Sequence, residues 1–145
     1  MSFVVALPKP IALTPRQRLV AVAVGRFALW AARGRRPDDR TRRVVAFALR
    51  RPCRASSPAE AEHAVNAVTT AVLRLGGTTA CLPRSLAAML FCRLHGHAPT
   101  LVIGIRPGTD EVHAWIDADG RAAAEPSNPR PAYTPVTIYR PGEQR

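Results

Sequence analysis

The sequence predicts an α+β fold in which helices come first and a small antiparallel sheet follows. Apolar residues recur at helical spacing at 19–32, at 61–75 and again from residue 81 onward. Two segments rich in β-branched or alternating apolar residues then follow at 100–106 and 111–117. With 145 residues, the chain is long enough to bury one hydrophobic core without disulfide bonds.

The first predicted helix contains the apolar stretch 19–32. Thr14 is a suitable N-cap, and Pro15 suits the first helical position. The stretch is interrupted by Arg26 and is shorter than the roughly 20 apolar residues that a membrane-spanning helix needs. No small-residue cleavage site follows it, as a signal peptide would require. We therefore expect a helix that packs on the core or on a partner, and no membrane span.

The net charge of +11 is concentrated in the N-terminal part of the chain. Residues 1–59 contain thirteen basic residues and only two aspartates, whereas residues 60–145 are electrically balanced. A basic stretch at 40–54 has one apolar side, as a surface helix would. This asymmetry predicts two parts, a basic helical segment (1–57) that docks a partner or substrate and a core (58–145) that carries the chemistry.

Two further helices are predicted in the middle of the chain. Ser57-Pro58 is a typical helix start, and Gly76-Gly77 ends the apolar pattern that follows it. The next helix begins with a cap near Thr79-Ala80. Cys81 therefore lies at the N-terminus of that helix.

Cys81 is the best candidate for a nucleophile. Unpaired backbone N–H groups and the positive end of the helix dipole favour a thiolate at this position. The N–H groups of Cys81 and Leu82 can also donate to the oxyanion that forms when a thiolate attacks a carbonyl. Cys92 lies in mid-helix and is predicted to be a small buried hydrophobe, and Cys53 has no assigned role. The odd number of cysteines argues against a disulfide framework and for a cytoplasmic location.

His113 is the predicted partner of that thiol. The segment 111–117 alternates as a strand does, which places His113, Trp115 and Asp117 on one face. An imidazole that can accept and return a proton, together with a thiol, makes a minimal nucleophile-and-base pair.

The register of the following hairpin determines which carboxylate holds the imidazole. The run at 117–120, Asp-Ala-Asp-Gly, is typical of a turn with glycine in the left-handed position, and a three-residue loop would set Arg121 opposite Asp117. Glu125 would then lie directly opposite His113, with about 5 Å between the Cβ atoms.

The two aspartates of this hairpin are less suitable. Asp117 shares the face of His113 but lies roughly 13 Å along the strand, and Asp119 is farther away in the turn. We therefore predict Glu125 as the third member of a triad. A two-residue loop would instead pair Glu125 with Ala114, on the opposite face.

Several motifs resemble those of a known enzyme family. In chain order they are Cys81-Leu82-Pro83-Arg84-Ser85-Leu86, Cys92-Arg93-Leu94-His95-Gly96, Leu101-Val102-Ile103-Gly104-Ile105-Arg106, His113-Ala114-Trp115-Ile116 and Asp119-Gly120-Arg121. They look like the motifs of the leader peptidases of lasso-peptide biosynthesis, which belong to the transglutaminase-like cysteine protease superfamily. The resemblance covers about residues 58 to 140. It implies a transglutaminase- or papain-like core in which the cysteine helix packs against a small antiparallel sheet.

The resemblance assigns a role to each residue of the triad. Cys81 would be the nucleophile, His113 the base and Glu125 the third member, where many relatives have aspartate. Pro83 is a second departure, because a polar residue often follows the Cys-Leu pair in relatives. Backbone groups are therefore expected to hold the oxyanion.

The resemblance also implies a substrate and partners. The substrate would be the leader region of a ribosomally made precursor peptide, which we expect Trp115 and Arg84 to contact. Family members of this short form work with a small leader-recognition protein and pass the freed core peptide to an ATP-dependent macrolactam synthetase. No cofactor is expected.

Other interpretations of the same residues remain open. The triad would equally serve a transglutaminase or an N-acyltransferase, in which an amine replaces water. The chain could also be a non-catalytic basic module, although no nucleic-acid-binding motif accompanies its arginines and we expect no nucleic-acid partner. A metal site at Cys92, His95 and His97 is disfavoured because these residues span a helix end and lack a fourth ligand.

Overall fold

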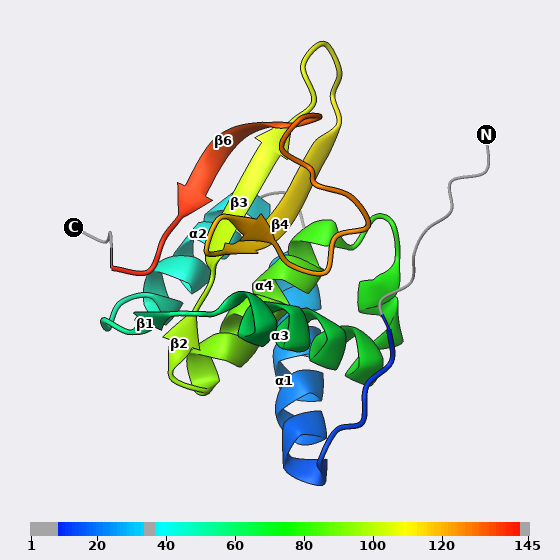
Figure 1. The fold of residues 1–145 in the computed structure, drawn as a ribbon, viewed down its shortest axis with the longest axis vertical. Helices are drawn as coiled ribbons and strands as arrows, with labels where there is room; N and C mark the ends of the chain where they lie inside the picture. The colour runs from blue at the N-terminus through cyan, green and yellow to red at the C-terminus, as the bar shows by residue number, and fades with distance from the viewer. Residues whose placement is uncertain (1–8, 34–36, 143–145) are drawn as a thin grey trace.

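The computed structural model describes residues 9–33 and 37–142, and it confirms the expected α+β fold (Figure 1). Within these residues the α-helices are α1 (Pro15–Ala31), α2 (Pro37–Ala48), α3 (Pro58–Ala71) and α4 (Cys81–Leu94). A 3-10 turn, η1 (Leu73–Gly76), precedes α4. The strands are β1 (Arg54–Ala55), β2 (His97–Ala98), β3 (Thr100–Ile105), β4 (Val112–Ala118), β5 (Arg121–Ala122) and β6 (Thr134–Tyr139).

The main sheet is antiparallel, with the strand order β5-β4-β3-β6. Figure 1 shows the helices gathered at one end of the molecule and the β3–β4 hairpin extending away from them. Strands β1 and β2 form a separate parallel pair, which joins the segment before α3 to the segment after α4. The long central strand β4 therefore lies between β3 and the short β5, with its first residues near the free end of the hairpin.

Helix α4 is the centre of the hydrophobic core. It packs against α1 and α3 and also against β4. Its side chains Leu86, Met89 and Phe91 are buried. Because a buried leucine or methionine contributes roughly 2–5 kcal/mol relative to alanine, this packing fixes the position of the whole helix.

The basic N-terminal helices share this core. Val24 and Ala28 of α1 and Val45 of α2 belong to the same buried cluster as the residues of α4. A Cβ atom at Gly25 would lie 2.7 Å from Cγ2 of Val72, so glycine allows α1 to lie close to the segment that follows α3. The basic N-terminal helices differ in charge from the rest of the chain, but their buried side chains belong to the same hydrophobic core.

The capping residues explain where the helices begin. Thr14 and Gln17 form a capping box at the start of α1, and Ser57 and Glu60 form one at the start of α3. Helix α3 ends at Ala71, earlier than its apolar pattern predicts, because the next residue is extended and η1 follows. In the described part of the chain, every helix is too short or too polar to cross a membrane.

Candidate active site

Cys81 is the first residue of α4, as the sequence predicts. No side chain caps this helix end, so the N–H groups of its first turn keep their capacity to donate. The Arg84 guanidinium donates to the carbonyl oxygens of Leu75 and Gly77, at 3.0 and 3.1 Å. Arg84, expected to contact substrate, thus also fixes the turn that delivers the chain to Cys81.

His113 contacts both of the residues with which it is predicted to act. Its Nε2 atom lies 3.0 Å from Oε2 of Glu125. The Cys81 thiol also raises the pKa of His113 by hydrogen bonding, so the imidazole lies beside the sulfur as well. The Glu125 side chain is only 12% exposed, so this contact is protected from competing water.

Proton affinities in this cluster favour an ion pair. Burial would raise the pKa of the Cys81 thiol, but hydrogen bonds from His113 and the Ala114 backbone, with the charges of His113 and Arg84, lower it below its ordinary value. Hydrogen bonds to Cys81 and Glu125 raise the pKa of His113 to about 9. Both shifts therefore favour a thiolate–imidazolium pair over a neutral thiol and a neutral imidazole.

Strand β4 contacts the nucleophile helix through its backbone as well. The backbone of Ala114 helps to lower the pKa of the Cys81 thiol. The carbonyl of the same residue accepts from Oγ of Ser85, at 3.1 Å. Sequence reasoning missed both contacts, although Ser85 lies one helical turn after Cys81 and so on the same face of α4. These bonds keep the helix end and the strand at a fixed distance.

The predicted hairpin register is wrong. Asp117 pairs with Ala122 and Ala118 with Arg121, so the loop contains two residues, Asp119 and Gly120. Both have positive φ values, 52° and 75°, as a type I′ turn requires. Aspartate tolerates this conformation better than most residues, and that tolerance favours the tighter loop.

Glu125 reaches His113 by a bend that replaces the expected strand pairing. Strand β5 ends at Ala122, and Ala124 has a φ of 53°. This left-handed residue turns the chain, so the side chain of Glu125 points back to the imidazole instead of to the far face. The sequence therefore predicts the contact between Glu125 and His113, but from a strand pairing that is absent from the structure.

Trp115 packs beside the imidazole. Its ring is stacked with that of His113 at 5.8 Å between centroids, and it is only 1% exposed. Its Nε1–H donates to Oδ1 of Asp117 at 3.0 Å, and the other oxygen of Asp117 pairs with Arg130. Trp115, expected to contact substrate, is covered in this structure and supports the imidazole from one side.

Tyr133 packs against both the imidazole and the Trp115 ring. The Tyr133 and His113 rings are 5.2 Å apart, and the Tyr133 hydroxyl donates to Glu111. A Cβ atom at Gly104 would lie 3.1 Å from Cβ of Tyr133 and 3.2 Å from the Trp115 ring, so glycine lets these rings pack closely against β3. The sequence pattern did not indicate that Tyr133 contacts His113, because Tyr133 lies in the irregular segment between β5 and β6.

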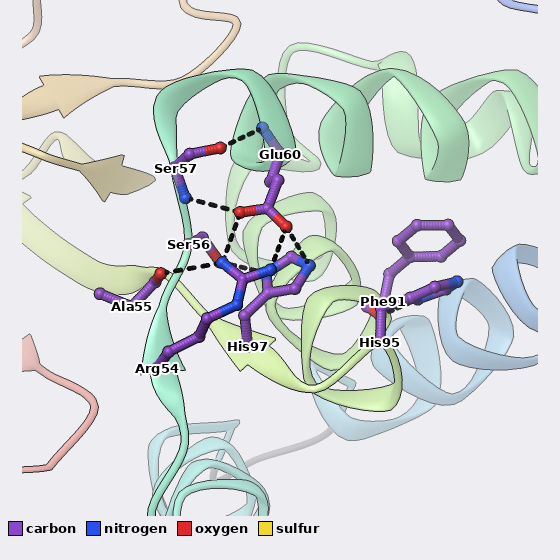
Figure 2. A network of polar contacts seen from close by, with 8 residues as sticks. All are labelled: Arg54, Ala55, Ser56, Ser57, Glu60, Phe91, His95 and His97. Atoms are coloured by element: carbon purple, nitrogen blue, oxygen red, sulfur yellow. Dashed lines mark hydrogen bonds and ion pairs between the residues drawn. The ribbon is translucent and has the colours of Figure 1, made fainter.

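A second histidine network lies at the start of α3 (Figure 2). His97 is bonded through Nδ1 to Oγ of Ser56 at 2.6 Å and through Nε2 to Glu60 at 3.0 Å. Arg54 holds both oxygens of Glu60. Burial lowers the pKa of His97, which favours the neutral ring. Ser56 is also buried, and its segment pairs with β2 through β1. The contacts of His97 therefore connect β1, β2 and the start of α3.

Cys92 differs from Cys81 in its environment. Burial raises the pKa of Cys92 to about 11, so it stays a thiol, as expected of a core cysteine. His95 is bonded to the carbonyl of Phe91 instead of turning toward Cys92 and His97. No group of three or more metal-ligating side chains converges anywhere in residues 9–33 and 37–142.

Comparison with known proteins identifies a family. A family model described as the transglutaminase-like superfamily matches residues 4–137, a range that includes α1, α4 and the whole His113 cluster. No curated protein and no solved structure matches the chain.

Proposed function

The chain belongs to the transglutaminase-like superfamily, and we propose that it is a cysteine peptidase with Cys81, His113 and Glu125 as its catalytic triad. One observation carries the proposal. His113 is hydrogen-bonded to a carboxylate and lies beside a thiol that begins a helix, and both neighbours raise the pKa of its imidazole. The carboxylate fixes the ring tautomer, and the ring raises the thiolate fraction.

The reaction follows from this geometry. The Cys81 thiolate attacks the carbonyl carbon of the scissile peptide bond, and a C–S bond forms. The N–H groups of Cys81 and Leu82 donate to the developing oxyanion. The His113 imidazolium gives its proton to the departing amine as the C–N bond breaks, which leaves a thioester.

Water then completes the cycle. His113, now neutral, takes a proton from a water molecule, and the resulting hydroxide attacks the thioester carbon. The C–S bond breaks, the carboxylic acid leaves, and the thiolate and imidazolium are restored. The proton lost in the first step is therefore returned to His113 in the second.

The proposed substrate is the leader region of a lasso-peptide precursor. The motifs quoted above from Cys81 to Arg121 support this class, because they recur in the order and at the spacing of leader peptidases. Cleavage at the leader–core junction would free the amine that a macrolactam synthetase needs. A small leader-recognition protein is the proposed delivery partner, since an unstructured leader loses entropy when it is ordered. The proposed location is the cytoplasm.

The test uses the purified protein with a lasso-peptide precursor and its small leader-recognition protein, sought among the products of neighbouring genes. Mass spectrometry of a reaction in H₂¹⁸O should find the freed core and a leader that carries ¹⁸O at its new C-terminus. Cys81→Ala should abolish both products, whereas Cys53→Ala should retain them. Cleavage by Cys81→Ala at the original rate contradicts the proposal. A leader joined to an added amine would identify an acyltransferase instead.

A further inference from the structure

An apolar groove lies between α1, α2 and the C-terminal half of α4. Its volume is about 520 Å³, and its walls include Phe27, Val44, Phe47, Leu90 and Leu94. Phe47 is 70% exposed and Leu94 is 66% exposed. A contiguous, solvent-exposed apolar surface of this kind is typical of an interaction site.

The groove is separate from the candidate active site. Helix α4 has Cys81 at its first residue and Leu94 at its last. At 1.5 Å per residue, these two ends are roughly 20 Å apart. The groove is therefore not part of the cluster around Cys81 and His113.

Arginines border the groove and lack matching carboxylates. Arg43 lines it and makes no hydrogen bond or ion pair with any residue in the described part of the chain. Arg93, on the opposite wall, donates from Nε to the carbonyl of Ala48 at 2.7 Å, and its terminal N–H groups face no acceptor among the described residues. Neither α1 nor α4 contains an acidic residue.

We propose that this groove binds an amphipathic helix of another protein, with an apolar stripe bordered by carboxylates. The apolar side chains would fill the groove, and the carboxylates would pair with Arg43 and Arg93. A helix suits a groove whose walls are themselves helices, because ridges of side chains pack between neighbouring helices.

The shape and charge of the groove disfavour two other occupants. Val24 and Ala48 form its floor and are each only 7% exposed, whereas Phe47 stands at the rim. A bilayer would cover the rim and leave that floor unfilled. In a symmetric dimer the same arginines of both copies would face one another, which is unfavourable.

The test uses the full chain and a fluorescein-labelled 18-residue helical peptide with a leucine stripe flanked by glutamates. A twin peptide carries lysines in place of those glutamates. Fluorescence anisotropy at 100 mM NaCl should give an affinity for the glutamate peptide at least about tenfold higher than for its twin. Hydrogen exchange should slow in α2 and at the end of α4 when the glutamate peptide binds.

Matched variants localise the binding. Phe47→Ser and Arg43→Glu should each weaken binding about tenfold. Leu73→Ser removes a leucine that is 84% exposed outside the groove, and Arg42→Glu changes the same charge on α2 at a residue that does not line it. Both controls should bind within about twofold of the unchanged chain. Thermal unfolding of each variant reports whether it folds.

Other outcomes overturn the proposal. Equal affinity for the two peptides, or equal weakening by Arg42→Glu and Arg43→Glu, would mean that the groove does not select a carboxylate-flanked helix. A dimer in sedimentation that Phe47→Ser dissociates would identify a second copy as the occupant. Binding to phosphatidylglycerol vesicles that is not reduced by the added peptide would identify a membrane surface as the occupant. Cys81→Ala should bind the peptide normally, so failure here leaves the proposed triad untouched.

Discussion

Oε2 of Glu125 lies 3.0 Å from Nε2 of His113. The register of the hairpin between them would place residue 125 on the opposite face if the second strand continued straight. The contact exists because β5 stops after two residues and Ala124 adopts a left-handed conformation. The proposed acid of the triad is therefore positioned by a bend in the backbone, and the imidazole that it holds packs against two aromatic rings, Trp115 and Tyr133, which also contact each other.

Cys81 should react with iodoacetamide faster than the other cysteines. At pH 7 we expect its alkylation rate to exceed that of Cys92 by more than about tenfold, because one thiol has a lowered pKa and the other a pKa of about 11. Peptide mass spectrometry of a labelling time course measures both rates. Labelling of the two residues at one rate in the folded protein would contradict the ion pair.

Replacing the carboxylate of Glu125 should weaken catalysis. Glu125→Gln removes a group that raises the pKa of His113, so the imidazolium should lose its proton at lower pH. We expect proteolysis to fall on the order of a hundredfold, with a smaller fall in peptide binding. Asp119→Asn makes the same chemical change in the exposed turn and should have little effect. If Asp117→Asn abolished cleavage while Glu125→Gln did not, the acid would be misassigned.

The charged state of His113 should stabilise the fold in a defined pH window. Its folded pKa of about 9 lies above the value of about 6.5 in an unfolded chain, so its contribution is complete below pH 6.5 and is lost as pH rises through 9. The difference in free energy of unfolding between the original chain and His113→Asn should shrink by about 1–3 kcal/mol from pH 6.5 to pH 10. Urea denaturation at both pH values measures it. A difference that grows with pH would contradict the assignment.

Tyr133 should act through its ring more than through its hydroxyl. Tyr133→Phe keeps the contact with His113 and loses the bond to Glu111, so we expect cleavage within about threefold of the original rate. Tyr133→Ala exposes the imidazole and should lower the free energy of unfolding by about 1–3 kcal/mol. The pH profile of Cys81 alkylation should shift only in the alanine variant. Equal profiles for both variants would assign Tyr133 no part in positioning His113.

Gly104→Ala should destabilise the protein by about 1–3 kcal/mol, because the added methyl group would press on Tyr133 and Trp115. Gly76→Ala is a matched control, since no atom lies within 4 Å of a Cβ at that position. Thermal denaturation of both variants compares them. Equal melting temperatures would show that the packing around His113 adjusts freely.

Local features of the sequence predict the nucleophile better than the acid. The Gly76-Gly77 break and the apolar pattern after it are sufficient to place Cys81 at a helix start. The predicted hairpin register failed because Asp-Gly also suits the end of a three-residue loop, whereas Asp119 and Gly120 here adopt the two left-handed positions of a two-residue type I′ turn.

Contacts made over long loops escaped prediction altogether. Tyr133 reaches His113 from a segment with no regular pattern, and Trp115 is buried by the same segment. The paired α1 and α4 are another example. Helix α1 also lies close to the segment that follows α3, and this approach depends on the missing side chain of Gly25 beside Val72, which periodicity alone does not reveal.

The bend at Ala124 also implies a rule for how such chains can change in evolution. Because the tight turn fixes one end of the segment and Glu125 must reach His113 at the other, the stretch between them is constrained in length more than in composition. Substitutions along it should be tolerated, whereas a single inserted or deleted residue should separate the acid from its histidine. Conserved spacing, instead of conserved identity, would then mark this part of the triad among related chains.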